Sequence, residues 1–247
     1  VKPAEDASLS TLRIAELAIE AGLPPGAFNV VTGYGAEAGA ALAGHRDINH
    51  VSFTGSTGSG AAVQQAAARN NVSVTMELGG KSPQIVFADA DLDAAVPFVV
   101  GAIVQNAGQT CSAGSRLLVE RPVYDAVVAK LIPKFEALVT GPGCDDADCG
   151  PLINARQMQR VLAMVEQAKR QGVRVLAEGR MASNAPAGGF YVTPKLLGGA
   201  GANSPIAQDE IFGPVLVVLP FDGEEEAVAI ATGTDFGDVA SLRHLVT

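Results

Sequence analysis

Residues 49 to 77 follow the order strand, glycine-rich turn, helix, strand, and this order constrains the fold more than any other feature. A predicted strand at 49–53 leads directly into Thr54-Gly55-Ser56-Thr57-Gly58-Ser59-Gly60, an alanine-rich segment reaches Arg69, and a β-branched run follows at 72–77. Two strands joined through a helix are typical of a parallel sheet covered by helices. The pattern therefore predicts an α/β protein with a parallel sheet.

The same alternation extends over the rest of the chain. After the short linker Gly79-Gly80-Lys81-Ser82-Pro83, strands are predicted at 84–87, 116–120, 173–177, 190–197 and 215–221, and helices at 91–107, 122–139, 156–171 and 224–231. Before the first strand, we expect helices at 8–22 and 37–43 and a short β-branched strand at 28–32. The segment 141–151 is interpreted as a surface loop. The final residues, 245–247, read as the interior of a strand.

Composition excludes several classes of protein. The chain has 247 residues, of which 48% are hydrophobic and 17% charged, as expected for a folded globular protein. Its net charge of −9 comes without a stripe of basic residues, so no nucleic-acid partner is expected. No apolar run is long enough for a membrane span and no signal peptide opens the chain, so we expect no membrane partner.

The three cysteines and the two chain ends give further expectations. Cys111, Cys144 and Cys149 are an odd number without a zinc-like pair, which favours a reducing, cytoplasmic location, although the spacing would permit a bridge from Cys144 to Cys149. The chain begins without an initiator methionine and stops within a predicted strand. We therefore expect a piece of a longer protein.

Cys111 is the leading candidate for a catalytic residue. It lies among small and amide-bearing residues, 105–116, which would leave room for a substrate and bring backbone N–H groups close to a developing negative charge. A thiolate is a strong nucleophile at an accessible pKa. The alternative is that a single intracellular cysteine is a small buried hydrophobic residue.

Two other positions suggest ligand binding on pattern alone. The turn at 53–58 leads into a helix N-terminus, whose free N–H groups suit a phosphate, although such glycine turns often serve only close packing. Glu77 ends a strand at the edge where parallel sheets keep their sites, and partial burial would raise its pKa toward that of a base; the alternative is a solvated edge glutamate. Glu210, taken alone, is a turn acid before a strand.

The sequence predicts neither a Cys-His dyad nor a metal site that would compete with the Cys111 site. His45, His50 and His244 lie in polar or terminal contexts away from any cysteine, so we expect surface histidines and no Cys-His dyad. The sequence contains no cluster of metal-ligating residues that would predict a metal site.

Taken together, the motifs resemble those of the aldehyde dehydrogenase superfamily from residue 1 to about Gly237. The matching stretches, in the family's order, are Lys2-Pro3-Ala4-Glu5, Gly22-Leu23-Pro24-Pro25-Gly26 with Phe28-Asn29-Val30-Val31-Thr32-Gly33, Phe53-Thr54-Gly55-Ser56-Thr57, Glu77-Leu78-Gly79-Gly80-Lys81-Ser82-Pro83, Gly108-Gln109-Thr110-Cys111, Gly150-Pro151-Leu152-Ile153 and Glu210-Ile211-Phe212-Gly213-Pro214-Val215. The resemblance implies a Rossmann-like parallel sheet, the second half of a cofactor domain at 1–78, followed by an α/β catalytic domain at 79–247.

The resemblance also assigns roles to individual residues. It implies oxidation of an aldehyde to a carboxylic acid, with Cys111 as the nucleophile that forms a thiohemiacetal and then a thioester, and Glu77 as the general base. Lys2 and Glu5 would hold the adenosine ribose, which favours NAD over NADP, and Ser56 would contact the pyrophosphate. Glu210 would bind the nicotinamide ribose beside Phe212. Gly55 and Leu78 are further expected cofactor contacts. The full-length protein would be a homo-oligomer.

Departures from the family pattern keep an alternative open. The upstream segment whose asparagine completes the oxyanion hole has no counterpart here, and Phe236-Gly237-Asp238-Val239 departs from the family's usual sequence. A catalytically silent, truncated fragment that retains only the fold or nucleotide binding is therefore the alternative. A cofactor-independent thiol esterase is a weaker one, because Lys2, Glu5 and Ser56 would then have no purpose.

Overall fold

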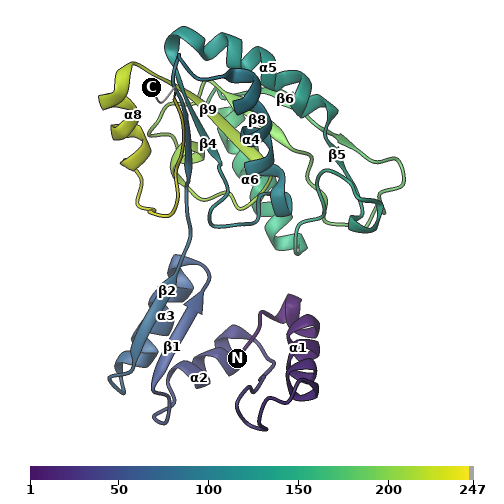
Figure 1. Cartoon of the computed structure of the whole chain (residues 1–247), viewed down its shortest axis with the longest axis vertical. Coiled ribbons are helices and arrows are strands. Elements are labelled where there is room, and N and C mark those ends of the chain that lie inside the picture. Colours follow the sequence, from purple (N-terminus) through teal and green to yellow (C-terminus); the bar gives the residue numbers. More distant parts are fainter. Residues whose placement is uncertain (245–247) are drawn as a thin grey trace. The chain divides into compact units, whose positions relative to one another are not determined.

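The computed structural model of the protein describes residues 1–244 and divides into two compact units, Val1–Gly79 and Gly80–Thr247 (Figure 1). The strand predicted at 245–247 lies outside the described residues. The roles predicted for 1–78 and 79–247, cofactor binding and catalysis, stay predictions. Each unit is an α/β structure, so the predicted fold class is confirmed.

The first unit contains a parallel pair of strands. β1 (His50–Thr54) and β2 (Ser73–Glu77) pair in register from His50 opposite Ser73 to Thr54 opposite Glu77, and α3 (Thr57–Ala68) connects them. The unit begins with a short 3-10 turn (Glu5–Ala7) and α1 (Ser8–Glu20), and a π-helical turn (Gly35–Gly39) precedes α2 (Ala40–Ala43). The strand–turn–helix–strand prediction is therefore correct.

The strand predicted at 28–32 does not form, because this β-branched run lies in an irregular segment outside the paired strands. Its backbone is held where the Val31 N–H donates to the Val1 carbonyl oxygen at 2.9 Å. β-branched residues favour extended backbone, but a strand also needs a neighbour along its length.

The second unit is built on a six-stranded sheet with the order β10-β3-β4-β9-β8-β6. The strands are β3 (Pro83–Val86), β4 (Arg116–Glu120), β6 (Arg174–Glu178), β8 (Lys195–Gly198), β9 (Val215–Phe221) and β10 (Ser241–Arg243). All neighbours are parallel except β6, which runs antiparallel to β8 with an irregularity between Val175 and Ala177. A separate short pair joins β5 (Val139–Thr140) to β7 (Arg180–Met181).

The strand predicted at 190–197 is mostly irregular, and only its end belongs to β8. The preceding carbonyls are used elsewhere, because Leu152 N–H donates to Phe190 O and Gly179 N–H donates to Pro194 O. Pro194 itself has no N–H for a sheet ladder, which explains why regular pairing starts only at Lys195.

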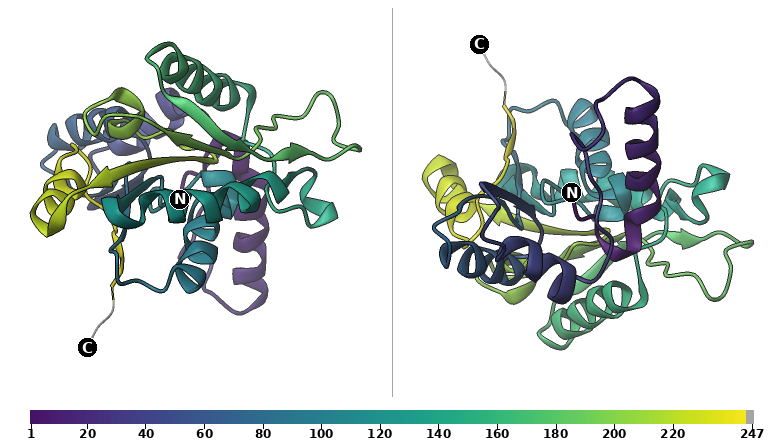
Figure 2. Two further views of the ribbon diagram at one scale, coloured as in Figure 1. Left: turned by 90° about the horizontal axis from the view of Figure 1, so that it is seen from above. Right: turned by 90° about the horizontal axis from the view of Figure 1, so that it is seen from below.

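Helices cover both faces of this sheet (Figure 2). α4 (Leu92–Val104) and α5 (Tyr124–Ala137) pack on one face, whereas α6 (Ala155–Arg170), α7 (Pro205–Gln208) and α8 (Gly223–Thr232) pack on the other. Neighbouring residues of a central strand serve opposite faces: Leu117 packs with α4 and α5, and Leu118 packs with α6. This period of two is that of a strand buried on both sides.

The structure tests the prediction of a surface loop at 141–151 and that of a possible bridge between its two cysteines. Cys144 is exposed, as expected of a surface loop, but Cys149 is 1% exposed and belongs to the core. All three cysteines are free thiols, so the bridge that the spacing would permit is not formed.

Among the described helices, none has the length and apolar character needed to cross a bilayer.

Candidate functional site

The turn that carries Cys111 begins with a run of left-handed backbone. After α4 ends at Val104, Asn106, Ala107 and Gly108 have φ values of 51°, 54° and 70°. A side chain on Gly108 would place its Cβ 2.2 Å from the carbonyl oxygen of Gly213, so only glycine fits there. The close approach fixes the cysteine turn against the segment that follows Phe212.

Amide side chains brace this turn. Asn106 Nδ2 donates to Gln109 O at 3.0 Å, and Gln109 Nε2 donates in return to Asn106 O at 3.1 Å. The Gln109 side-chain oxygen also accepts from Ile153 N at 2.8 Å. The side chains of Asn106 and Gln109 therefore hold the Cys111 turn in one conformation, which is the preorganisation that a catalytic group would need.

Cys111 is only partly buried, and its environment raises the pKa of the thiol. Burial is the largest cause, followed by the nearby Asp238 carboxylate; the backbone N–H groups of Ser112 and Cys111 act in the opposite direction. The thiol is therefore protonated at neutral pH. Because the thiolate is the reactive form, a base must remove the proton before attack.

Gly80 lies next to the Cys111 backbone and to the carboxylates of Glu210 and Asp238. Its N–H donates to Glu210 Oε1 at 3.1 Å. A Cβ on Gly80 would lie 2.2 Å from the Cys111 carbonyl oxygen and 3.1 Å from Asp238 Oδ2. The structure thus brings Cys111, Glu210 and Asp238 together around one glycine of the Gly79-Gly80 linker.

The segment that carries Glu210 and Phe212 is fastened to α6. Phe212 has a φ of 57°, which is an unfavourable conformation for a bulky residue. Gln157 Nε2 donates to the carbonyl oxygens of Ile211 (3.1 Å) and Phe212 (2.8 Å), and Arg160 Nη2 donates to Glu210 O (2.8 Å). These bonds offset the strain and hold Glu210 beside Gly80.

The remaining predicted site residues belong to the first unit. Lys2 Nζ lies 4.0 Å from Glu5 Oε2 and donates to Gly33 O at 3.1 Å, so the two side chains lie next to each other; their role in ribose binding stays a prediction. The Ser56 side chain accepts from Ser59 N at 3.2 Å and caps α3. This N-terminal turn contains no acidic residue, so its donors suit a phosphate anion.

Gly55, Glu77 and Leu78 surround the end of β2. Gly55 N–H donates to Glu77 O at 3.0 Å, which places the Ser56 turn beside the strand end. Leu78 packs against Gly60 of α3, where a Cβ would lie 2.6 Å from Leu78 Cδ2. Glu77 is exposed, so the partial burial predicted for it is not found. The three histidines are also exposed, as predicted.

Sequence reasoning missed the environment of Lys81. The side chain is 2% exposed, and its Nζ finds no hydrogen-bond partner among residues 1–244. Burial and the nearby Arg116 lower the pKa of Lys81 to about 7, although Asp209 and Glu210 act in the opposite direction. Its place in the Gly79-Gly80-Lys81 linker, between a glycine pair and a strand, was the only available sign of burial.

Replacing Lys81 by methionine should increase the free energy of unfolding at pH 7 by about 1–4 kcal/mol, because the variant no longer buries an unpaired ammonium group. Between pH 7 and 10.5 the unfolded wild type binds more protons than the folded one, so its stability rises with pH and is lost as pH falls toward 7. The gap between variant and wild type should therefore narrow as pH rises. Urea unfolding at several pH values measures it, with exposed Lys134→Met as the control. A constant gap from pH 7 to 10 would contradict the prediction.

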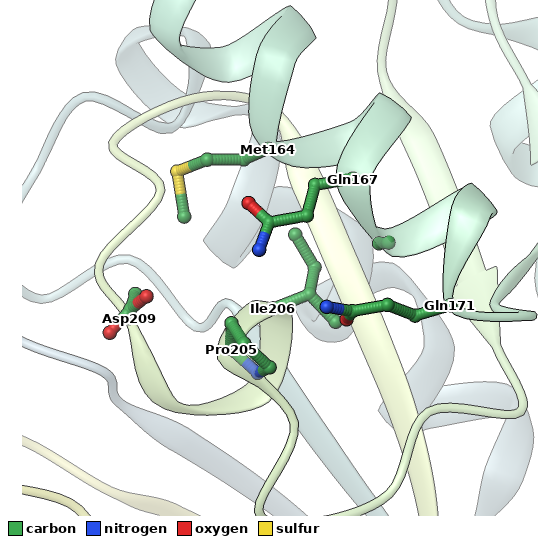
Figure 3. A pocket seen from close by; sticks show the side chains of 7 residues that line it. Met164, Gln167, Gln171, Pro205, Ile206 and Asp209 are labelled. Atoms are coloured by element: carbon green, nitrogen blue, oxygen red, sulfur yellow. The ribbon is translucent and has the colours of Figure 1, made fainter.

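A hollow between α6 and α7 is lined by none of the predicted site residues (Figure 3). Its volume is about 20 Å³, which is room for about one water molecule. It is lined by Met164, Gln167, Ala168, Gln171, Pro205, Ile206 and Asp209. It contains no nucleophile and is too small for an organic substrate, so we place the site at the Cys111 turn.

Comparisons with known proteins agree on one family. The model of the aldehyde dehydrogenase family matches residues 1–243. The chain is 42% identical over 244 residues to rat (Rattus norvegicus) aldehyde dehydrogenase, cytosolic 1, covering 98% of the chain and 48% of that protein. A crystal structure of a provisionally named aldehyde dehydrogenase from Burkholderia cenocepacia is 58% identical, with a TM-score of 0.99 over 100% of this chain and 52% of that one.

A second solved structure carries a cofactor. The NAD⁺ complex of aldehyde dehydrogenase from Bacillus cereus is 41% identical, with a TM-score of 0.94 over 99% of this chain and 50% of that one. The chain thus spans about half the length of the relatives it matches.

Proposed function

The chain belongs to the aldehyde dehydrogenase family, and on this premise we propose that it carries the catalytic thiol and part of the NAD site of an enzyme that oxidises an aldehyde to a carboxylic acid. The observation that carries the proposal is the braced, left-handed turn that presents Cys111 beside Glu210 at Gly80. A turn of this kind costs conformational energy, and such strain is characteristic of functional sites.

The proposed chemistry starts at the Cys111 sulfur. Once a base has taken the thiol proton, the sulfur electron pair attacks the aldehyde carbon and gives a thiohemiacetal. Backbone N–H groups such as that of Cys111 would stabilise the oxyanion. NAD, when bound, supplies the acceptor for the hydride that leaves this carbon. The resulting thioester is then hydrolysed by water, which releases the carboxylic acid and the thiol.

Contacts of the described residues support the cofactor proposal. Lys2 and Glu5 would hold the adenosine ribose, the capped N-terminus of α3 at Ser56 would bind the pyrophosphate, and Glu210 would bind the nicotinamide ribose beside Phe212. Gly55 and Leu78 would complete the contacts near the end of β2. The Glu5 carboxylate would repel a 2′-phosphate, so NAD is favoured over NADP.

Glu77 is proposed as the base for the thiol or the hydrolytic water. Glu77→Gln keeps the shape of the side chain but removes the proton acceptor, so we expect the rate of aldehyde oxidation to fall on the order of 10²-fold. The measurement is NADH formation across pH 6 to 9. Exposed Glu37→Gln, in the same unit, serves as the control. If the Glu77→Gln variant oxidised aldehydes as fast as the wild type over this pH range, Glu77 would be excluded as the base.

The direct test of the function is NADH formation at 340 nm with short and long aldehydes, using NAD and NADP in parallel. Aldehyde-dependent reduction of NAD supports the proposal. If no aldehyde is oxidised while NAD still binds, the alternative of a catalytically silent fragment that retains nucleotide binding is favoured. We further propose a cytoplasmic location and a homo-oligomeric full-length protein, which sedimentation and cell fractionation would test.

A further inference from the structure

Gln84 is a buried amide that joins the end of the Cys111 turn to α4. It belongs to β3 and is 4% exposed. Its Nε2 donates to the Gly114 carbonyl oxygen at 2.8 Å and to the Val99 carbonyl oxygen of α4 at 3.2 Å. Both hydrogens of the amide are therefore used, and both acceptor residues are buried.

A backbone bond fixes the same end of the turn. The Gly114 N–H donates to Ala102 O at 3.1 Å, and Ala102 is one of the last four residues of α4, whose carbonyl oxygens have no donor within the helix. The N–H of Gly114 is thus bound to α4 directly, and its carbonyl oxygen is bound to α4 through the side chain of Gln84.

The contact between Gln84 and Gly114 is close. A Cβ on Gly114 would lie 2.5 Å from Gln84 Nε2, so the amide reaches the carbonyl only because this residue is glycine. Since Gly114 is buried, water cannot replace the amide as donor unless the segment moves outward. Loss of the amide should therefore loosen the end of the turn.

We propose that Gln84 is a positioning residue for the Cys111 nucleophile, because its amide fixes on α4 the side of the turn that follows the thiol. This inference rests on the proposed function of Cys111. Asn106 and Gln109 hold the side that precedes the thiol, so the turn is fastened on both sides. Such fastening matters for attack on a bound aldehyde, since a misplacement of about 1 Å can cost on the order of 10²-fold in rate.

The three free thiols can separate this role from a general contribution to packing. Cys111 is partly buried in the turn, Cys149 is 1% exposed in the core, and Cys144 is exposed. Loosening of the turn exposes Cys111 alone, whereas opening of the second unit also exposes Cys149. Cys144 reports the reactivity of the reagent itself.

The test is alkylation of the purified chain by iodoacetamide from pH 6 to 10, with the rate at each cysteine read by peptide mass spectrometry. Gln84→Met keeps the length of the side chain but removes both donors, so we expect Cys111 to react about threefold to tenfold faster at pH 7, with Cys149 and Cys144 unchanged. Because burial raises the pKa of the Cys111 thiol, greater exposure should also move its profile to lower pH. Exposed Gln167→Met is the matched control and should behave as the wild type.

Gly114→Ala tests the same contact from the other side. The added Cβ meets the far end of the Gln84 side chain, so it should push the amide off its acceptors and raise the Cys111 rate in the same way. This variant also decides the question if Gln84→Met does not fold. Its control is Gly201→Ala, where an added Cβ has no neighbour within 4 Å.

Two results would overturn the proposal. If Cys111 kept the wild-type rate in both variants, the amide would not hold the turn. If Cys111 and Cys149 became faster together, Gln84 would support the core and not the nucleophile. Alkylation uses neither aldehyde nor NAD, so a protein without dehydrogenase activity still tests Gln84, and a failure of Gln84 leaves the proposed function of Cys111 untouched.

Discussion

Cys111→Ala is expected to reduce aldehyde-dependent NADH formation on the order of 10³-fold or more, because no other described thiol stands at the braced turn beside Glu210. NAD binding should change little, since Lys2, Glu5 and Ser56 belong to the first unit and keep their contacts. The measurements are the initial rate at 340 nm and NAD titration followed by fluorescence or calorimetry.

The matched control is Cys144→Ala, which removes an exposed thiol from the loop at 141–151. It should leave the rate within a factor of about two, as is usual for surface substitutions away from a site. If Cys111→Ala retained activity, the nucleophile assignment would be wrong. If it lost NAD binding to the same extent as activity, the substitution would have damaged the fold and the loss could not be assigned to the thiol.

The regular elements could be predicted where the sequence pattern and the packing agree. The strands at 116–120 and 215–221 were predicted with the bounds that the structure shows, because central strands of a parallel sheet are apolar on both faces and stand out as continuous runs. The helix predicted at 91–107 begins with Asp91, a residue type that favours helix N-caps, and the Asp91 carboxylate accepts from the N–H groups of Asp93 and Ala94.

Elements that depend on distant partners could not be predicted in this way. The run at 28–32 has the composition of a strand but no neighbouring strand to pair with. The apolar residues of α1 also lack the contacts that their spacing would predict. The spacing of Leu9 and Ile19 indicates a packed helix face, yet both side chains are mostly exposed in the first unit. Local pattern therefore identified the helix correctly but not what its face contacts.

In the candidate site, too, local features could be predicted and features that depend on distant partners could not. Its chemical groups could be identified from local motifs, since Cys111 and Glu210 each stand in a recognisable stretch. Their mutual placement depends on the left-handed run at 106–108, for which only Gly108 gave a local sign. It also depends on the hydrogen bond from the Gly80 N–H to Glu210 Oε1, which joins segments 130 residues apart in the chain. Such contacts are set by tertiary packing and leave no periodic signal.

Arg116→Met should destabilise the second unit by about 3–5 kcal/mol, the usual cost of removing one partner from a buried, hydrogen-bonded charge site. The side chain is 1% exposed, and burial lowers its pKa only to about 10, so the guanidinium is charged at pH 7. Methionine fills most of the space but leaves the carbonyl oxygens of Lys81, Ile230 and Ala231 without their donor.

The control is Arg121→Met, because Arg121 also forms a two-pronged bond, to the Asp222 carboxylate, but more than half of its side chain is exposed. Exposed ion pairs contribute about 0–1 kcal/mol, so its urea midpoint should move little. Equal midpoints for both variants would show that Arg116 is not a structural anchor.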